Sequence, residues 1–255
     1  MKILITGANG YIGKSLYNAL KDKHEVTAIT KKEVNLTNSS SVNLFFLEEK
    51  YDVVIHCAVV GGSRLVEDKW DVMDTNLIMY YNLLANKDHF KKFIHFGSGA
   101  ETYMPKEPYG YSKKIIAKSI LNQPNFHNLK IFGVFDENEL DTRFIKSNIK
   151  RYINKGPMQI HQDKAMDFIY MPDLVSIVEY YINEKEPLKE FDCIYPHPIN
   201  LIDITNIINK LGNYEVDIIN QGKNGDDYIS KYRTALPIKF IGLEEGIKQV
   251  YNKLK

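Results

Sequence analysis

The sequence predicts an α/β protein built on a Rossmann-like, doubly wound parallel sheet. Apolar runs of strand length alternate with helix-length stretches from the first residue to about residue 140. The first run leads directly into glycines at positions 7, 10 and 13, and an amphipathic stretch follows. With 255 residues, of which 44% are hydrophobic, the chain is long enough to bury the core that such a sheet needs.

The elements of this first part follow one another in a regular order. After the strand that precedes Gly7, we expect strands at 26–29, 52–57, 92–96 and 129–134. We expect helices between them near 11–21, 39–49, 66–86 and 109–121. The strands are near-continuous apolar runs, which is typical of a parallel sheet covered by helices on both faces. Right-handed crossovers between successive βα units then give the doubly wound arrangement.

The chain changes character beyond about residue 140. A helix near 142–154 precedes short strands with more prolines and tyrosines, and helices return near 172–183, 200–211 and 243–253. We therefore expect a dinucleotide-binding Rossmann domain at 1–140 and a small α/β substrate-binding part at 141–255, interleaved with the first. In open α/β folds ligands bind beyond the carboxyl ends of the strands, which is where this second part is expected to lie.

Composition excludes several classes of protein. The chain has 33 Lys and Arg against 32 Asp and Glu, so its net charge of +1 offers no footprint for nucleic acid or an anionic membrane. Cys57 and Cys193 are too few for a disulfide framework, and no Cys/His cluster has the spacing of a metal site. No apolar run is long enough to span a bilayer. We expect a cytoplasmic protein without a metal.

The glycine-rich turn predicts a site for a pyrophosphate. Gly7 permits the tight turn, Gly10 lets the backbone approach the ligand, and Gly13 lets the helix pack on the strand. The N-terminus of the following helix supplies unpaired N–H groups and the positive end of its dipole. The residues expected to bind the cofactor here are Gly7, Asn9, Gly10, Tyr11, Ile12 and Gly13, with Ala58 after the third strand.

The segment after the second strand bears on the choice of dinucleotide. Thr30, Lys31 and Lys32 stand where an acidic residue would bind the hydroxyls of the adenosine ribose. Without that carboxylate a 2′-phosphate is not repelled, and a lysine can pair with it. We therefore expect NADP(H) rather than NAD(H). The alternative is that Lys31 and Lys32 are only the charged residues of a solvated turn.

A second motif carries acid–base chemistry. Tyr109 and Lys113 are four residues apart, so on a helix they lie on the same face. An ammonium beside a phenol lowers the pKa of the phenol from its usual value near 10, which makes it a usable proton donor. Ser98 follows the fourth strand and places a hydroxyl at its carboxyl end. Asn76 lies in the helix before that strand.

With these motifs the chain resembles the extended short-chain dehydrogenase/reductase family, in particular its nucleotide-sugar-modifying branch. The resemblance rests on Gly7, Gly10, Gly13, Asn76, Ser98, Tyr109 and Lys113, which occur in the family's order. It implies that Tyr109 transfers the proton and that Ser98 holds the carbonyl or alkoxide oxygen. It also implies that Lys113 tunes Tyr109 and binds the nicotinamide ribose, while Asn76 supports a relay to Lys113.

Within this family the chain is most similar to the GDP-L-fucose synthase-like 4-keto reductases. Asn35 and Leu36 resemble the family's acidic-Leu pair near the adenine, with Asn in place of the usual Asp. Gly61 and Gly62 would bring the backbone close to the sugar. The resemblance further implies a homodimer, formed through the helices near 66–86 and 109–121.

The departures from that group concern epimerisation. Its members place a cysteine two residues after the catalytic serine and a histidine at the start of a later helix, where this chain has Ala100 and Arg143. Neither residue supplies the base and acid that epimerisation next to a ketone needs. Glu101 remains as a nearby acid or base and a candidate contact to the substrate. Arg143 and Arg151 are expected on one helix and near one face of it, where the resemblance implies that Arg151 binds the substrate's pyrophosphate.

The sequence thus predicts an NADPH-dependent reductase of a nucleotide-linked 4-keto-6-deoxy sugar, in surface-polysaccharide biosynthesis. Its substrate-binding residues would be Gly61, Gly62, Ser98, Glu101, Arg143 and Arg151. Two alternatives remain open at this point. One is a nucleotide-sugar epimerase that keeps NAD tightly bound, and the other is an inactive NADP-sensing protein on the same fold.

Overall fold

The computed structural model describes residues 1–63 and 65–255, with the backbone alone at 223 and 224. The chain forms two compact units. The first unit comprises residues 1–130 and 178–191, and the second comprises 131–177 and 192–255. Each unit is therefore made of two separate stretches of sequence, and the division falls within β5, α7 and β10.

A six-stranded sheet with the order β10-β5-β4-β3-β1-β2 forms the centre of the first unit. Its strands are β1 (Lys2–Thr6), β2 (Glu25–Ile29), β3 (Tyr51–His56), β4 (Phe90–Ser98), β5 (Phe126–Ile131) and β10 (Glu190–Cys193). The pairs β1–β2, β1–β3 and β3–β4 are parallel, and Thr6 lies between Ile29 and His56. The predicted parallel α/β fold is confirmed. The direction of winding reverses between β1 and β3, which is where open α/β sheets bind their ligands.

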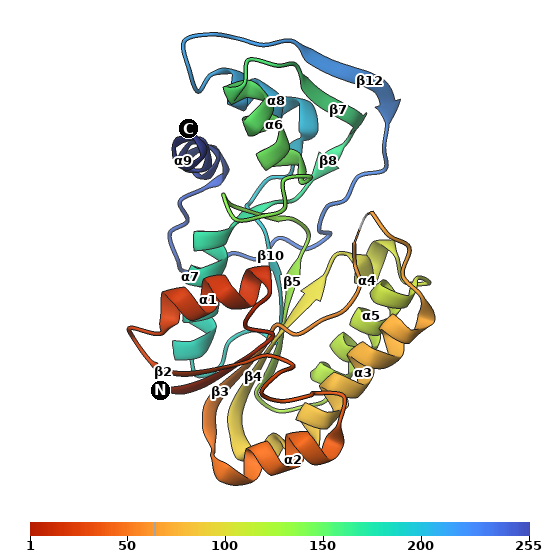
Figure 1. Ribbon diagram of the computed structural model, residues 1–255, viewed down its shortest axis with the longest axis vertical. Helices are drawn as coiled ribbons and strands as arrows, with labels where there is room; N and C mark the ends of the chain where they lie inside the picture. Colours follow the sequence, from red (N-terminus) through yellow and green to blue (C-terminus); the bar gives the residue numbers. More distant parts are fainter. Residues whose placement is uncertain (64) are drawn as a thin grey trace. The chain divides into compact units, whose positions relative to one another are not determined.

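Helices cover both faces of this sheet (Figure 1). They are α1 (Tyr11–Leu20), α2 (Ser39–Glu48), α3 (Trp70–Leu84), the short α4 (Ala100–Tyr103) and α5 (Pro108–Leu121), with a 3₁₀ turn at Lys87–His89. Helices α3 and α5 pack side by side on one face, and α1 lies against β1 and β2. Leu16 and Leu20 of α1 are fully buried, as the amphipathic pattern predicts.

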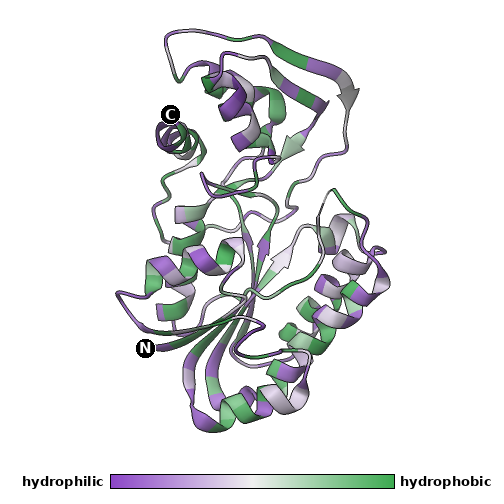
Figure 2. Ribbon diagram, viewed as in Figure 1, coloured by the Kyte–Doolittle hydropathy of each residue, from purple (hydrophilic) through white to green (hydrophobic). Residues whose placement is uncertain are grey.

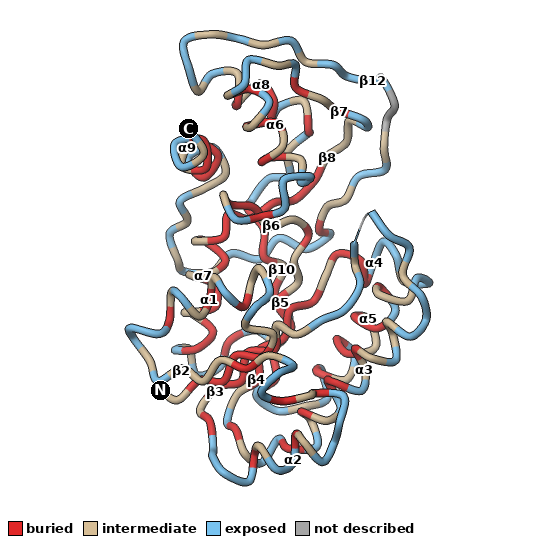
Figure 3. Tube along the Cα trace, viewed as in Figure 1, coloured by how far each residue is buried: buried red, intermediate tan, exposed pale blue. Residues whose placement is uncertain are grey.

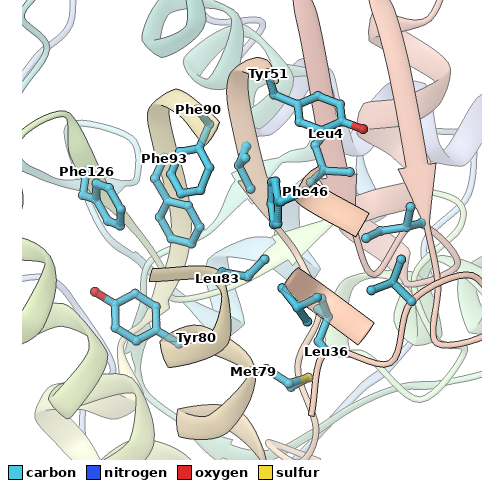
Figure 4. Close-up of a cluster of buried hydrophobic side chains, with 14 of the residues drawn as sticks. Leu4, Leu36, Phe46, Tyr51, Met79, Tyr80, Leu83, Phe90, Phe93 and Phe126 are labelled. Atoms are coloured by element: carbon cyan, nitrogen blue, oxygen red, sulfur yellow. The ribbon is translucent and has the colours of Figure 1, made fainter. Parts of the chain in front are cut away.

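An aromatic cluster fills the space between the sheet and α2, α3 and α5 (Figure 4). Phe93 of β4 stacks on Phe126 of β5 with ring centroids 4.7 Å apart, and Tyr80 of α3 meets Phe93 edge-on. Phe46 of α2 also belongs to this cluster. Figure 3 shows buried segments in the central strands of the sheet and largely exposed connections around them. This core holds the carboxyl ends of β1, β3 and β4 at a common edge.

Two predicted boundaries are wrong. The fifth strand spans Phe126–Ile131 rather than 129–134. Asn125, with its left-handed φ of 56°, turns the chain directly into the strand, and beyond Ile131 the carbonyl of Gly133 binds Ile169 N–H instead of the sheet. Residues 134–135 form the separate strand β6. The helix expected from 66 begins at Trp70, and Lys69 is its N-cap. The chain before Lys69 is a loop.

The second unit is built of short strand pairs and helices. Its elements are β6 (Val134–Phe135), α6 (Phe144–Ile153), β7 (Met158–Asp163), β8 (Ala165–Met166), β9 (Ile169–Tyr170), α7 (Met171–Asn183), β11 (Ile199–Asn200), α8 (Leu201–Asn209), β12 (Ile218–Asn224) and α9 (Leu243–Leu254). The four helices that the sequence predicts in this region are present. In Figure 2, α9 carries both hydrophobic and hydrophilic residues, and Ile247 and Val250 form its buried side. Among the described residues no helix has the length and apolar character needed to cross a membrane.

Candidate functional site

The turn after β1 requires glycine at its first position. Gly7 has a φ of +66°, and a Cβ there would lie 2.5 Å from the backbone N of Ala58 and 2.6 Å from its Cα. No side chain fits that space, since contacts below 3.0 Å force the backbone apart. Gly7 therefore brings the end of β1 against the end of β3. This places Ala58, predicted to contact the cofactor, beside the turn.

The other two glycines shape the start of α1. Gly10 is its N-cap and donates its N–H to the Gly7 carbonyl at 2.9 Å. A Cβ on Gly10 would lie 3.2 Å from Gly7 O, and one on Gly13 would overlap the carbonyl oxygen of Gly7. The first turn of α1 carries no acidic side chain. Its N–H groups, beside the exposed Asn9, fit a pyrophosphate.

The turn after β2 is organised by an acidic residue that sequence reasoning did not single out. Glu33 Oε2 accepts hydrogen bonds from Thr30 N at 2.7 Å and from Thr30 Oγ1 at 2.6 Å, which lowers the pKa of Glu33. Lys31 and Lys32 are exposed beside it. The Glu33 carboxylate therefore forms its hydrogen bonds within its own turn, while the side chains of both lysines are exposed to solvent. These are the features expected of a pocket that accepts a 2′-phosphate.

The Asn35–Leu36 pair that was matched to the adenine site is built into its own turn. Asn35 Oδ1 accepts hydrogen bonds from Thr37 N at 3.2 Å and Thr37 Oγ1 at 2.8 Å. Leu36 is buried, and its carbonyl accepts from Asn82 Nδ2 of α3 at 2.8 Å. The pair therefore fixes the backbone of this loop; its contact with the adenine stays a prediction.

Ser98 ends β4 with its side chain half-buried. Its Oγ accepts a hydrogen bond from Ala100 N at 3.1 Å, and its own backbone N–H donates to Glu101 Oε1 at 2.9 Å. The hydroxyl is thereby held at the carboxyl end of the strand, as the sequence predicts. The hydroxyl proton of Ser98 stays available to a ligand oxygen because Oγ is the acceptor in this contact.

Tyr109 and Lys113 lie on the first two turns of α5. The Lys113 ammonium sits 5.7 Å from the centre of the Tyr109 ring, so the predicted pairing on one face of a helix is observed. Lys113 is 4% exposed and donates to the carbonyl of Phe96 at 2.6 Å. Burial lowers the pKa of Lys113 to about 8, and the negative charge of Glu101 opposes that shift. A lysine that titrates so near neutrality can tune a phenol at physiological pH.

The loop after β3 lies directly on the Tyr109 ring. Gly62 has a φ of +73°, and a Cβ there would come within 2.8 Å of the ring carbons of Tyr109. Asp68 holds the loop by accepting the Gly62 N–H at 2.9 Å. The predicted closeness of Gly62 to the reaction centre therefore has a basis in this contact with Tyr109, whereas a Cβ on Gly61 would meet Val72 and Asp68. Asp68 was not found from the sequence, because nothing in its local pattern marks a carboxylate that binds a loop six residues earlier.

Asn76 fixes the same loop from α3. Its Oδ1 accepts from Val60 N and its Nδ2 donates to Val60 O, both at 3.0 Å. Nδ2 also reaches Ser112 Oγ at 3.3 Å, and that hydroxyl donates to the carbonyl of Tyr109 at 2.7 Å. Asn76 is thus buried, and its hydrogen bonds connect the loop to α5. Its proposed relay to Lys113 stays a prediction.

These motifs place a dinucleotide turn and a Ser–Tyr–Lys group in one unit. Residues 3–194 match the NAD dependent epimerase/dehydratase family. The chain belongs to that family. The resemblance read from the glycines, Ser98, Tyr109 and Lys113 is thereby confirmed at the level of the family.

Several relatives in the family are named for sugar-nucleotide chemistry. GDP-L-colitose synthase of Yersinia pseudotuberculosis is 25% identical over 223 residues, which cover 72% of each chain. GDP-6-deoxy-D-talose 4-dehydrogenase of Aggregatibacter actinomycetemcomitans is 38% identical over 136 residues, covering 50% of this chain and 43% of that protein. The spore coat polysaccharide biosynthesis protein SpsK of Bacillus subtilis is 25% identical over 194 residues, covering 69% of this chain and 68% of that protein.

Solved structures share the fold over the whole chain. A dTDP-4-dehydrorhamnose reductase from Clostridium acetobutylicum superposes with a TM-score of 0.82 at 23% identity, covering 100% of this chain and 99% of that one. A GDP-mannoheptose C4 reductase from Campylobacter jejuni with NADP bound gives 0.79 at 17% identity, covering 99% and 98%. At these identities the two structures confirm the predicted fold.

The second unit carries the two predicted substrate arginines. Arg143 is the N-cap of α6, and its carbonyl accepts the Ser147 N–H at 2.9 Å, so the helix begins one residue after Arg143. That Arg143 and Arg151 lie near one face stays a prediction. Both residues are exposed, and Arg151 belongs to the last turn of α6. The buried Glu139 holds the start of this helix by accepting the Lys146 N–H at 3.2 Å. Burial raises the pKa of Glu139 to about 8.

The Arg233 guanidinium forms an internal ion pair with Asp167, at 2.9 Å between Nη2 and Oδ2, and donates to the carbonyl of Tyr195. Asp167 is 1% exposed and also accepts the Ser230 N–H. Arg233 therefore holds the second unit together. This leaves Arg143 and Arg151 as the predicted contacts to a substrate phosphate.

Proposed function

We propose that the chain is an NADPH-dependent reductase of a nucleotide-linked 4-keto-6-deoxy sugar. The observation that carries the proposal is the Ser98, Tyr109 and Lys113 group beside a dinucleotide turn in a single unit. The names of the related synthases and reductases support a sugar nucleotide as the substrate. The relation to a spore coat polysaccharide protein supports a role in making a surface polysaccharide.

Each residue of the group has a distinct task in this reaction. The dinucleotide, bound over the Gly7–Gly13 turn, supplies the hydride. Ser98 donates its hydroxyl proton in a hydrogen bond to the substrate carbonyl oxygen, and Tyr109 protonates that oxygen as negative charge develops on it. The buried Lys113 ammonium favours the phenolate that Tyr109 leaves behind. Gly62 and Asn76 fix the loop that packs on the Tyr109 ring.

The cofactor preference follows from the turn after β2. Thr30 and Glu33 bind one another there, while Lys31 and Lys32 remain exposed. A 2′-phosphate would add two negative charges, which exposed ammonium groups attract and a free carboxylate would repel. Two of the solved structures with this fold are named with NADP bound. We therefore expect NADPH to support faster reduction than NADH at equal, subsaturating concentration.

The same site argues against epimerisation. Ala100 stands where GDP-L-fucose synthase-like enzymes have a cysteine, and it is 2% exposed, with a methyl group that cannot move a proton. Arg143 stands where they have a histidine, and a guanidinium stays protonated throughout the physiological range. Reduction needs neither residue. The proposed product therefore keeps the configuration of the carbons beside the ketone.

Reduction in D₂O tests the whole proposal. Nucleotide-linked 4-keto-6-deoxy sugars with GDP, CDP, dTDP or UDP are offered to the enzyme with NADPH or NADH, and the products are weighed by mass spectrometry. We expect NADPH oxidation without deuterium bound to carbon. Deuterium on carbon would mean that the chain epimerises, and an enzyme that purifies with NAD and oxidises no NADPH would be an epimerase. Tight NADP(H) binding with no turnover of any sugar would identify a sensor.

We further propose that the protein is a homodimer formed through α3 and α5. Exposed apolar side chains gather on these two helices: Trp70, Ile78, Tyr81, Tyr111 and Leu121. Trp70 is 56% exposed although its ring meets Tyr111 edge-on across the two helices. Apolar groups clustered on neighbouring helices are typical of a protein–protein contact. A second copy of the chain would bury the same patch on both partners.

A charge on this patch should separate the dimer. We expect Ile78→Glu to convert the protein to a monomer in sedimentation experiments, because a carboxylate buried in an apolar interface lacks a partner. Leu44→Glu is the matched control, since Leu44 is 65% exposed on α2, outside the patch. A parent protein that sediments as a monomer at micromolar concentration would contradict the proposal. So would an Ile78→Glu variant that remains dimeric.

A further inference from the structure

We propose that Glu101 is a positioning residue for the proposed reduction: its buried carboxylate fixes Ser98 and serves as the counter-ion that keeps Lys113 protonated. The inference rests on the proposed function of the Ser98–Tyr109–Lys113 group. It departs from the sequence-based expectation, which placed Glu101 among the groups that contact the substrate.

Glu101 and Lys113 bind the same three-residue segment from opposite ends. Lys113 Nζ donates to the carbonyl of Phe96 at 2.6 Å, and Glu101 Oε1 accepts from the backbone N–H of Ser98 at 2.9 Å. Only Gly97 stands between these two contacts. The ammonium and the carboxylate therefore hold the last residues of β4 together. A shift of either group moves the strand end that carries the Ser98 hydroxyl.

The carboxylate is built into the protein interior. Glu101 is 8% exposed, and its Oε2 forms an ion pair with Lys130 Nζ at 3.6 Å. Asn128 Nδ2 approaches Oε1 at 3.4 Å. A Cβ on Gly97 would overlap Glu101 Oε1 and lie 2.6 Å from Asn128 Oδ1. Gly97 therefore leaves the room that this carboxylate fills, and the side chain has the partners of a structural anion rather than of a group that waits for substrate.

The charge balance around Lys113 gives Glu101 its second task. Several titratable groups act on Lys113 or share its surroundings. They are His56 at the end of β3, Cys57 directly after it, His95 on β4, Tyr109 on α5, Glu101 on α4 and Lys130 on β5. Burial lowers the pKa of His56 to about 3 and that of His95 well below its usual value, so both rings are neutral. Burial raises the pKa of the Cys57 thiol, which keeps it neutral as well.

Burial raises the pKa of Glu101, while the Lys130 charge and the hydrogen bond from Ser98 N–H act to lower it. Of these groups it is the carboxyl that can balance a buried ammonium. Desolvation lowers the pKa of Lys113, and Glu101 is the first charge that acts in the opposite direction. Removing that charge lowers the pKa further, so Lys113 loses its proton at a lower pH. The neutral amine no longer favours the Tyr109 phenolate. Activity that depends on the ammonium should then fall off at a lower pH than in the parent.

The test compares Glu101→Gln with the parent by two measurements. In protein labelled with ¹³C at the lysine Cε, the signal lost in Lys113→Met identifies Lys113, and its shift is followed against pH. We expect the Lys113 titration in Glu101→Gln to move to lower pH by about one unit. We expect the alkaline limb of the kcat profile to move by the same amount, while KM for NADPH changes less than kcat. Glu139→Gln, at a carboxyl of similar burial in the second unit, should leave the Lys113 titration in place.

The two measurements separate the inference from the proposed function. If the Lys113 signal moves but no nucleotide sugar is reduced, the counter-ion role stands and the proposed reaction fails. If the sugar is reduced but the Lys113 titration stays where it is in the parent, the inference is overturned. Thermal unfolding checks that Glu101→Gln is folded. Should it not fold, the double variant with Lys130→Met removes the ion pair as a whole, and a smaller displacement of the Lys113 titration to lower pH is expected, because a positive charge is lost with the negative one.

Discussion

Replacing Tyr109 with phenylalanine should lower kcat for sugar reduction by about 10³-fold, because the reaction loses the group that protonates the developing alkoxide. The phenyl ring keeps the packing against Gly62, and Lys113 keeps its hydrogen bond to Phe96 O. We therefore expect the affinity for NADPH to change by less than about threefold, well under 1 kcal/mol. Fluorescence titration of NADPH and steady-state kinetics measure the two quantities separately.

Tyr111→Phe is the control for this variant. Tyr111 lies two residues further along α5 and is exposed on the side of the helix that meets Trp70. The loss of its hydroxyl should leave kcat within a factor of about two, as is usual for surface substitutions. Turnover by Tyr109→Phe at the parental rate would show that another group donates the proton. Equal losses in both variants would point to damage to α5 instead.

The sequence predicted the parts of the site that depend on local chemistry. Gly7 and Gly13 stand in a strand–turn–helix pattern, and that pattern alone requires residues without side chains. Tyr109 and Lys113 are one helical turn apart, so their pairing follows from the period of the helix. Ser98 was found because its strand is a plain apolar run that stops at Gly97. In each case the residues that define the feature lie within a few positions of one another or within one strand or helix.

What the sequence did not predict depends on hydrogen bonds and ion pairs that the residue types alone do not mark. Asp68 binds Gly62, Glu33 closes its own turn on Thr30, and Glu101 pairs with Lys130 of another strand. A carboxylate bound to a backbone N–H looks, in the sequence, like any solvated acid. Its role becomes visible only when burial and partners are known, because a buried charge is retained only where it is paired.

The wrong boundaries have a similar origin. Residues 132–134 are as apolar as a strand, but Gly133 carries its hydrogen bond to Ile169 and leaves the sheet. Arg143 was counted into a helix because helix ends are poorly marked in the sequence, and its extended ψ of 146° instead makes it the N-cap. Period and composition identify an element, whereas its last residue is set by the tertiary hydrogen bonds that compete for the chain.

Gly7→Ala should strongly destabilise the folded protein. A φ of +66° costs an alanine about 1–2 kcal/mol, and a Cβ 2.5 Å from Ala58 N adds an overpacking cost of about 1–3 kcal/mol. We therefore expect the free energy of unfolding to fall by about 3 kcal/mol, a large part of the stability of an ordinary domain. Urea unfolding followed by circular dichroism measures this loss.

Gly222→Ala separates the two contributions. Gly222 has a φ of +69°, nearly that of Gly7, but among the described residues no atom lies within 4 Å of the place of its Cβ. Gly222→Ala should therefore lower the free energy of unfolding only by the cost of the left-handed backbone conformation, about 1 kcal/mol. It should leave NADPH binding unchanged. The difference between the two variants is the cost of forcing β1 away from β3 at Ala58. Equal losses would mean that the ends of these strands can part freely, and the tight turn would then not be what holds the dinucleotide site in shape.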